Sequence, residues 1–270
     1  MERDYEILAD AAEAIARAAG ARLLEFFRRE HLQVETKLNE SDIVTEADRA
    51  SEETILRLVS ERFPTHSVLS EESGESVRDG EFRWVIDPLD GTTNFRCGLP
   101  FFSVSIGIEH FGEAVAGVVY APQLGEMFRG VRGGGATLNG KPMACSSIPS
   151  LDRSVLATGF PVDKSVNPDN NLDNVGRLLP RIRGLRRLGS AAIDICYTAA
   201  GFLEGYWEMN LHDWDITAGM VIAREAGCLT GEFRSDRNRS VVVAPPQLFD
   251  EIRRELSSRP GSADIKKTTF

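Results

Sequence analysis

The stretch RWVIDPLDGTTNF at residues 83–95 constrains the fold of this chain more than any other. Its apolar run is typical of a buried strand, yet Asp87 and Asp90 follow that run at once. Asp-Pro and Asp-Gly are common turn dipeptides, so each aspartate alone has an ordinary explanation as a turn residue. Two carboxylates around a rigid proline, followed by a glycine amide and two hydroxyls, also make a compact set of hard oxygen ligands beside a small anion cradle. The rest of the chain decides between a turn and a site.

Two amphipathic helices open the chain. Apolar side chains recur at helical spacing over residues 4–29, which predicts a long first helix. The segment IVTEADRASEETILRLVSERF (43–63) predicts a second helix, with Thr45 and Asp48 in a capping pattern at its start. We therefore expect a helical layer ahead of the main strands.

Short strands follow in the first half of the chain. HSVLSEES (66–73) predicts a strand that runs into acids, and residues 82–87 form the strand of the opening stretch. Alternation over 102–122 predicts a hairpin that turns near Gly112, and short strands continue through 126–143. The first half is therefore expected to combine helices with an antiparallel sheet.

Composition shifts near residues 144–154, where we place a domain boundary. This boundary divides the chain into an N-terminal domain, 1–145, and a C-terminal domain, 146–270. Beyond it strands and helices alternate, which is typical of a parallel or mixed sheet covered by helices. Strands are expected in 154–160, 183–188, 202–209 and 240–246, and helices over 167–180, 190–201, 214–227 and 246–257. We expect the tail from Gly261 to be loosely packed.

The charge and the cysteine pattern exclude several classes of protein. A formal net charge of −10 and a pI of about 5.0 argue against a general nucleic-acid binder, which needs a basic face. The cysteines are scattered with no CxxC pair, so neither a disulfide framework nor a zinc site is expected. No apolar run approaches the ~20 residues of a membrane helix, and the acidic N-terminus does not resemble a signal peptide. We therefore expect a cytoplasmic protein that binds neither membrane nor nucleic acid.

Further acids stand where strands end or helices begin, so that loops can deliver them to one place. Glu71 and Glu72 follow a strand, Asp48 and Asp215 open helices, and Glu208 ends a strand. Each has an ordinary explanation, because an EE pair is usually solvated and acids are favoured at helix starts. Clustered, they would repel one another unless divalent cations neutralised them. A set of oxygen ligands suits Mg²⁺ or Mn²⁺ better than zinc.

These motifs resemble the inositol monophosphatase family of metal-dependent, lithium-sensitive phosphatases. The family patterns GEE, DP(I/L)DGT and WD-x-(A/S/T)-(A/G)-G correspond to residues 70–72, 87–92 and 214–219, and GFPVDK (159–164) is similar to the bacterial type. Their order and spacing match from Lys37 to about Gly227. The resemblance implies an α+β or α/β fold in the form of a layered α-β-α-β-α sandwich, and a homodimer.

The sequence departs from the family pattern at two positions. Ser70 stands where the family usually has glycine, which we expect to change the flexibility of the loop and not metal ligation. Asp213 adds an acid just before Trp214 that many relatives lack, and we expect it to tune metal affinity.

The resemblance implies a role for each acid in binding two or three Mg²⁺ ions, with Mn²⁺ as a possible substitute. Glu71 and Asp87, with the carbonyl of Leu89, would hold the first ion. Asp87, Asp90 and Asp215 would hold the second. A third, looser ion would share Glu71.

The remaining implied roles concern the attacking water and the substrate. Thr92 and Asp48 would orient the water that attacks phosphorus, with Glu71 also counted among the catalytic residues. The amides of Gly91 and Thr92 would cradle the phosphate. The hydroxyls of the alcohol would meet Asp90, the backbone of Ala191, Glu208 and Asp215.

The implied reaction is hydrolysis of a phosphate monoester, with inositol-1-phosphate as the preferred substrate. The same motifs serve fructose-1,6-bisphosphate, histidinol-phosphate and 3′-phosphoadenosine-phosphate hydrolysis in this family. Glu208 favours a polyol, because a carboxylate accepts hydrogen bonds from ring hydroxyls and would repel a second phosphate.

A second hypothesis is an interaction protein. The segment RLLPRIRGLRR, from Arg177 to Arg187, concentrates basic residues in an acidic chain, and some bacterial relatives are reported to bind the transcription machinery. The ordinary explanation is a solvated surface or a subunit interface, since charge runs are usually solvated.

Overall fold

The computed structural model describes residues 2–30, 32–36 and 43–257. Lys37, where the family resemblance begins, and the C-terminal tail from Gly261 lie outside the described residues.

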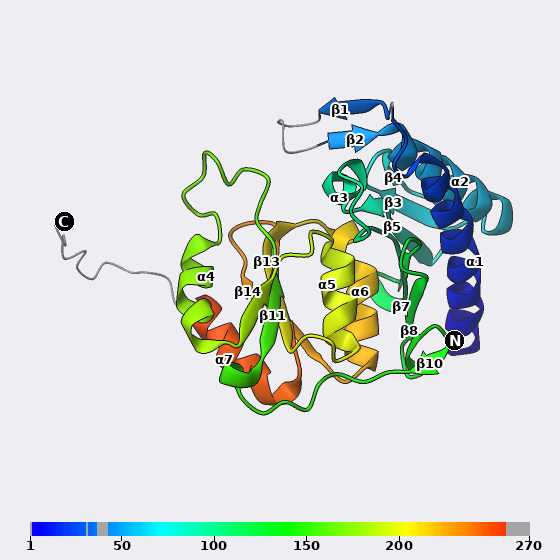
Figure 1. Ribbon diagram of the computed structural model, residues 1–270. Helices are drawn as coiled ribbons and strands as arrows, with labels where there is room; N and C mark the ends of the chain where they lie inside the picture. The colour runs from blue at the N-terminus through cyan, green and yellow to red at the C-terminus, as the bar shows by residue number, and fades with distance from the viewer. Residues whose placement is uncertain (1, 31, 37–42, 258–270) are drawn as a thin grey trace.

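Five layers stack across the molecule (Figure 1). One outer layer holds α1 (Glu2–Phe26) and α2 (Glu46–Arg62), and the opposite outer layer holds α4 (Leu172–Leu178) and α7 (Pro246–Ser257). The central layer is formed by α5 (Ala191–Ala199) and α6 (Asp213–Glu225), with one sheet on each side. The order is therefore α-β-α-β-α, which confirms the layered sandwich.

The sheet beside α1 and α2 has eight strands in the order β10-β9-β8-β7-β6-β5-β3-β4. Neighbouring strands are antiparallel except for β3 and β5, which are parallel. The strands are β3 (Ser67–Ser70), β4 (Gly74–Ser76), β5 (Phe82–Asp90), β6 (Ser103–His110), β7 (Glu113–Ala121), β8 (Glu126–Val131), β9 (Gly135–Leu138) and β10 (Lys141–Pro142). The hairpin of β6 and β7 turns at residues 111–112, as the alternation predicts.

The sheet beside α4 and α7 has five strands in the order β12-β11-β13-β15-β14. β11 is parallel to both of its neighbours, whereas β15 is antiparallel to both of its own, so the predicted mixed sheet is confirmed. The strands are β11 (Val155–Thr158), β12 (Gly184–Arg186), β13 (Gly205–Leu211), β14 (Leu229–Arg234) and β15 (Arg239–Ala244).

The central helices share one apolar core with both sheets. Val119 and Phe128 of the first sheet belong to the same buried cluster as Ile195 of α5, Ile222 of α6 and Val243 of the second sheet. The helices of the second half of the chain therefore cover the sheet of the first half. The proposed boundary near 144–154 overlaps residues 143–150, which connect β10 to a 3₁₀ turn at Leu151–Arg153 without helix or strand.

Several predicted helix bounds differ from the structure for local reasons. The first helix ends at Phe26 and not near 29, because Arg28 takes a left-handed conformation with φ 62°. The second begins at Glu46, because Thr45 is its extended N-cap and Ile43–Thr45 form β2, which pairs with β1 (Val34–Thr36). The helix expected over 167–180 begins only at Leu172.

Two strand predictions also need correction. β14 was not predicted, because its sequence LTGEFR mixes polar and apolar residues on a partly exposed edge strand. The strand expected over 82–87 continues to Asp90, so both aspartates of the opening stretch lie within β5. Within the described ranges, no helix has the length and apolar character needed to cross a bilayer.

Candidate active site

An irregularity in β5 brings the two aspartates of the opening stretch to one face of the sheet. Asp87 pairs with Ser105 of β6 and Asp90 pairs with Ser103, so three steps along β5 match two steps along β6. Side chains alternate between faces along a strand, and two residues three positions apart would otherwise point to opposite faces. The extra residue is a β-bulge, which resets the alternation at the cost of one unpaired position. Asp87 and Asp90 therefore share a face.

Asp87 lies at the centre of a group of acids. Its side chain is buried, and its Oδ1 accepts a hydrogen bond from the Leu89 amide at 3.0 Å. Burial raises the pKa of Asp87 well above its ordinary value, and the charges of Glu71, Asp90 and Asp215 raise it further. The predicted metal ligands therefore lie close enough to perturb one another strongly.

Asp90 is held by the N-terminus of α5. Its carboxylate accepts hydrogen bonds from Ser190 Oγ at 2.5 Å, from the Ala192 amide at 2.8 Å and from the Ala191 amide at 3.3 Å. Burial raises the pKa of Asp90 to about 6, although these donors act in the opposite direction. Ala191, predicted to meet the alcohol through its backbone, thus lies directly against Asp90.

Gly91 starts the short helix α3 (Thr92–Arg96) in a conformation that favours glycine. Its φ is 92°, and a Cβ placed there would come within 2.9 Å of the Phe101 carbonyl oxygen and 3.2 Å of the Gly189 carbonyl oxygen. The close approach leaves no room for a side chain. The amides predicted to cradle a phosphate therefore sit on a constrained turn directly after Asp90.

Thr92 and Asp48 are joined by a hydrogen bond across two segments of the chain. Thr92 Oγ1 lies 3.1 Å from Asp48 Oδ1 and 3.1 Å from the Leu89 carbonyl oxygen. Asp48 Oδ2 accepts from the amide and the hydroxyl of Thr45 at 2.9 and 2.6 Å, which is the predicted capping box of α2. Burial raises the pKa of Asp48 to about 7 against the effect of the Thr45 hydrogen bonds. Asp48 therefore both caps α2 and orients Thr92.

Glu71 follows β3 on a loop that is fastened to α2. Ser70, at the end of β3, is buried and donates its hydroxyl to Glu52 of α2. Glu52 also accepts from the amide and hydroxyl of Ser73, each at 3.0 Å. The serine at 70 thus ties the loop that carries Glu71 to the helix, in agreement with an effect on loop flexibility.

The sequence predicts that Asp215 starts its helix, but the structure places the start of the helix earlier. α6 begins at Asp213 with His212 as its N-cap, and Asp215 accepts a hydrogen bond from the His212 amide at 2.7 Å. Asp215 therefore occupies the third position of the helix, where a carboxylate reaches back to the N-cap. Burial raises its pKa well above the ordinary value, opposed by the His212 amide and supported by the charges of Asp90, Glu71 and Glu208.

Asp213 does not join this group. It pairs with Arg239 at 3.5 Å and lines a separate groove, so the expected effect on metal affinity would have to act at a distance. Of the two acids beside Trp214, Asp215 lines the cleft and Asp213 does not.

Glu208 lies on β13, against the backbone that directly follows the end of β11. The buried Tyr206 donates its hydroxyl to Glu208 Oε2 at 2.8 Å, and a Cβ at Gly159 would overlap the Glu208 carboxylate. Burial raises the pKa of Glu208 to about 7, while the Tyr206 hydrogen bond and the charge of Arg187 lower it. Gly159 and Tyr206 therefore fix where this carboxylate lies.

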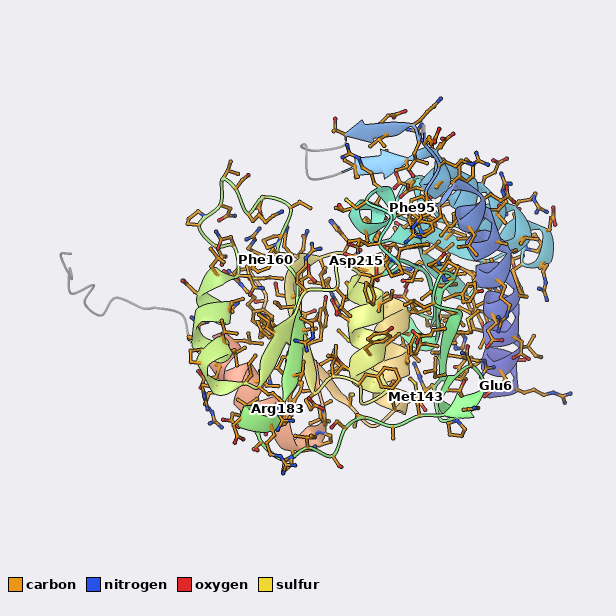
Figure 2. The ribbon with its side chains drawn as sticks, viewed as in Figure 1. Glu6, Phe95, Met143, Phe160, Arg183 and Asp215 are labelled. Carbon is orange, nitrogen blue, oxygen red and sulfur yellow. The ribbon has the colours of Figure 1, made fainter. Side chains whose placement is uncertain are left out.

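Two adjoining cavities, of about 420 and 510 Å³, form the cleft above these residues. Both are lined by Glu71, Phe160, Val162 and Glu208. The first also contains Gly91 and Thr92, and the second also contains Asp215. Figure 2 places Phe160 and Asp215 at the same end of the molecule. Of the predicted site residues, Glu71, Gly91, Thr92, Glu208 and Asp215 thus line this cleft, whereas Asp48, Asp87, Leu89, Asp90 and Ala191 are not among its lining residues.

The donor set fits a hard divalent cation. Within ranges 2–30, 32–36 and 43–257, no three His, Cys, Asp or Glu side chains are arranged to hold a metal ion as they stand. The carboxylates of Asp87, Asp90 and Asp215 are turned toward backbone or hydroxyl donors instead. Their mutual repulsion is what a divalent cation would relieve, and carboxylate and carbonyl oxygens are the ligands that Mg²⁺ prefers.

Sequence reasoning missed the residues that position the acids. Ser190, Tyr206 and Gly159 hold Asp90 and Glu208 in place, and Ser51 of α2 donates to the Pro88 carbonyl at 2.7 Å. Ser190 had a signal, since a serine before an apolar helix is a common N-cap. The others are recognisable only once distant strands are brought together.

A cleft lined by carboxylates and by the turn at Gly91 suits the binding of divalent cations beside a phosphate group, as in a metal-dependent phosphatase. The sequence model of the inositol monophosphatase family matches residues 4–259, and the chain belongs to this family. The family resemblance of the motifs is thereby confirmed.

Relatives in this family carry two kinds of name. The chain is 44% identical over 255 residues to an "Inositol-1-monophosphatase" of Synechocystis sp., covering 93% of this chain and 88% of the relative. It is 41% identical over 243 residues to a "Nus factor SuhB" of Pasteurella multocida, covering 88% and 91%.

Solved structures of proteins with both kinds of name are similar to this chain. Inositol monophosphatase from Anabaena aligns with a TM-score of 0.84 at 37% identity, covering 94% of this chain and 96% of that one. The extragenic suppressor protein suhB from Bartonella henselae aligns with a TM-score of 0.87 at 35% identity, covering 93% and 99%.

Proposed function

We propose that the protein is a metal-dependent phosphomonoesterase that hydrolyses inositol-1-phosphate, or a similar polyol phosphate, to the alcohol and inorganic phosphate. The observation that carries this proposal is the position of the Thr92–Asp48 hydrogen bond beside the buried acids Asp87 and Asp90. A hydroxyl oriented by a carboxylate, next to a site for cations, is what the activation of a water molecule requires.

Five residues would hold two or three Mg²⁺ ions, or Mn²⁺ in their place: Glu71, Asp87, Asp90, Asp215 and Leu89 through its carbonyl. When bound, the ions supply positive charge that makes water more acidic and neutralises phosphoryl oxygens and the leaving alkoxide. The buried carboxylates fix where that charge can sit.

The chain's own polar groups orient the reactants. Thr92 Oγ1 donates its proton toward Asp48 or the Leu89 carbonyl, which leaves its lone pairs to accept a hydrogen bond from the attacking water. The amides of Gly91 and Thr92 direct their dipoles toward the phosphoryl oxygens without adding a titrating group. Glu208, Asp90, Asp215 and the α5 start at Ala191 form the wall that receives the hydroxyls of the alcohol.

The reaction is expected to require Mg²⁺ or Mn²⁺, because the ligand set contains only oxygen. Purified protein should release phosphate from inositol-1-phosphate with either ion, stop in excess chelator, and recover when Mg²⁺ is restored. Lithium in the millimolar range should inhibit, as the family resemblance implies. Phosphate release that continues unchanged in chelator would rule out this mechanism.

The structure also supports a competing class of substrate, in which the molecule carries a second phosphate. Arg96, Lys164 and Arg187 line the same cleft as Glu208, and Arg187 lies near enough to lower the pKa of Glu208. These cations offset the repulsion of a second phosphate that Glu208 alone would exert. A phosphate-release screen should therefore include fructose-1,6-bisphosphate, histidinol phosphate and 3′-phosphoadenosine phosphate beside inositol-1-phosphate, and compare kcat/KM across them.

A second candidate function is the interaction with the transcription machinery that the family resemblance implies, and several relatives are named "Nus factor SuhB". The basic segment from Arg177 to Arg187 is less uniform than its sequence suggests. Arg177 donates to the Glu255 carbonyl and Arg181 pairs with Glu251, so both are bound to α7. Arg187 is exposed but lines the cleft, which leaves Arg183 and Arg186 as exposed members that lie outside the cleft and are not paired with α7 in the described part of the chain.

Arg183 and Arg186 are therefore the two positions whose substitution tests this role. Figure 2 places Arg183 at the end of the molecule opposite Asp215. Arg183→Glu/Arg186→Glu should abolish co-purification of transcription proteins with the tagged chain and leave phosphate release unchanged. Arg253→Glu, an exposed arginine on α7, is the matched control. Capture that is the same in all three proteins would dismiss an interaction through these arginines.

The homodimer and the cytoplasmic location expected from the sequence belong to the same proposal. Gel filtration with light scattering would test the first, and cell fractionation the second.

A further inference from the structure

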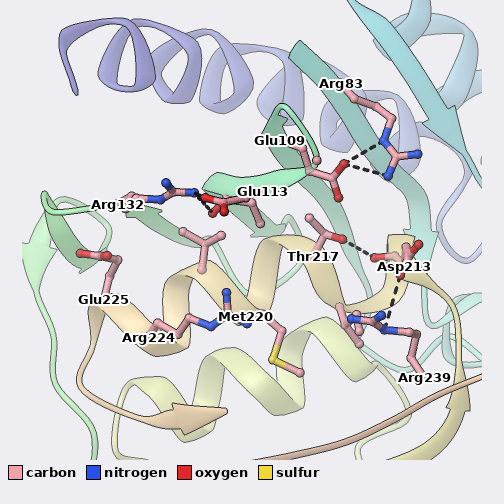
Figure 3. A pocket seen from close by; sticks show the side chains of 14 residues that line it. Arg83, Glu109, Glu113, Arg132, Asp213, Thr217, Met220, Arg224, Glu225 and Arg239 are labelled. Carbon is pink, nitrogen blue, oxygen red and sulfur yellow. Dashed lines mark hydrogen bonds and ion pairs between the residues drawn. The ribbon is translucent and has the colours of Figure 1, made fainter. Parts of the chain in front are cut away.

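A second groove, separate from the catalytic cleft, lies along α6. It has a volume of about 580 Å³ and runs between α6, the tip of the β6–β7 hairpin and the start of β15 (Figure 3). This volume is within the usual range of small-molecule sites. The floor is apolar, since Met220 and Val221 are nearly fully buried beneath it.

The acids that line this groove already have partners. Arg83 Nε donates to Glu109 at 2.8 Å, and Arg132 pairs with Glu113 at 3.1 Å. Asp213 pairs with Arg239 at 3.5 Å. The fourth acid, Glu225, accepts hydrogen bonds from the amides of Gly133 and Gly135 at 3.1 and 3.0 Å.

Arg224 is different from the other arginines of the groove. Its Nε donates to Thr230 Oγ1 at 2.8 Å, and within the described part of the chain no carboxylate pairs with it. Partial burial lowers its pKa, and the charges of Arg132 and Arg239 lower it further. A guanidinium has five N–H donors, so most of those on Arg224 remain available to a ligand.

Figure 3 shows Arg224 near Met220, with Arg132 turned toward Glu113 and Arg239 turned toward Asp213. Arg239 also pairs with Glu232 at 3.1 Å. Arginine binds phosphate oxygens through two parallel hydrogen bonds, and neighbouring arginines that repel one another are stabilised by a shared dianion. We propose that this groove binds a phosphate dianion, either free or carried by a small organic molecule, at Arg224 with Arg132 and Arg239 beside it. The proposal does not depend on the catalytic function.

The methionines offer a readout that separates the two sites. Met220 lines this groove, whereas Met209 lines the catalytic cleft. The full chain, labelled at its methionine methyl groups, is titrated in excess chelator with inorganic phosphate, with ribose 5-phosphate and with chloride at matched ionic strength. The Met220 signal is assigned with Met220→Leu.

Both phosphates are expected to shift the Met220 signal, and chloride is not. Arg224→Gln should raise the phosphate Kd at least tenfold, and the exposed variant Arg132→Gln should raise it about threefold, whereas Arg253→Gln should leave it unchanged. Tighter binding of ribose 5-phosphate than of phosphate would show that the organic body uses the apolar floor, and equal binding would identify free phosphate as sufficient.

Three results would overturn the proposal. These are a phosphate shift at Met209 alone, a Met220 shift that chloride reproduces, and unchanged affinity in Arg224→Gln. If Arg224→Gln does not fold, an unchanged affinity in Arg132→Gln has the same meaning.

Discussion

Asp87→Asn and Asp90→Asn are each expected to lower kcat by several orders of magnitude while the fold survives. Each substitution keeps the size of the side chain but replaces a charged metal ligand with a neutral one, which leaves a cation under-coordinated. The measurement is kcat for inositol-1-phosphate at saturating Mg²⁺, with circular dichroism to confirm the fold.

The two variants should differ in stability without metal. A carboxyl whose pKa is raised on folding opposes the folded state at pH values above its ordinary pKa, so removing the charge of Asp87 should raise the melting temperature in chelator at pH 7. At Asp90 the asparagine carbonyl can replace Oδ2 and still accept from Ser190 Oγ and Ala192 N, but its NH2 group would then face the Ala191 amide. Leaving a buried donor unsatisfied costs about 1–3 kcal/mol, which opposes the gain from removing a charge whose pKa is raised to about 6, so the melting temperature should rise less than in Asp87→Asn.

Asp250→Asn, an exposed acid on α7, is the control for both variants. Near-wild-type turnover in either active-site variant would mean that the DPLDG stretch serves only the backbone of β5. A fall in turnover that comes with loss of the fold would also fail to support the proposed ligand role.

Asp215→Asn should likewise abolish activity and raise the Mg²⁺ concentration needed for half-maximal rate. The loss of stability in Asp215→Asn should be small, because the asparagine carbonyl can still accept a hydrogen bond from the His212 amide and asparagine is acceptable at helix starts. The lost interaction with the helix dipole is about 0.3–1 kcal/mol. The loss of a repelling charge acts in the opposite direction, since burial and neighbouring acids raise the pKa of Asp215.

The melting temperature in chelator should therefore move little, and Mg²⁺-dependent kinetics decide the role of Asp215. Asp213→Asn, two residues away on the same helix, is the matched control because that side chain pairs with Arg239 outside the cleft. Unchanged kcat with unchanged Mg²⁺ dependence in Asp215→Asn would make this acid a helix-capping residue alone.

The sequence predicts well those features that depend on local pattern. The capping box of Thr45 and Asp48, the hairpin near Gly112 and the helix after Ser190 follow from neighbouring residues, and the structure contains each of them. The family resemblance then supplies the identity of the candidate ligands, because short motifs in a fixed order are specific even when each is weak.

Features that depend on distant segments are not accessible in this way. Nothing near Glu208 indicates that Gly159 leaves room for it, and nothing near Arg187 separates it from Arg183, although one lines the cleft and the other lies at the opposite end of the molecule. The position of Asp215 within α6 was wrong by two residues, because the true N-cap is a histidine, which is an uncommon choice.

The bulge between Asp87 and Asp90 makes the site sensitive to the number of residues between these two aspartates. At their spacing of three residues, both carboxylates face the cleft only because β5 carries one residue more than its partner between them. A substitution at Pro88 or Leu89 keeps that count, but one residue inserted between the aspartates would turn Asp90, and with it Gly91 and Thr92, to the opposite face while the single bulge is kept. Lineages of such a chain can thus change residues here far more freely than they can change its length.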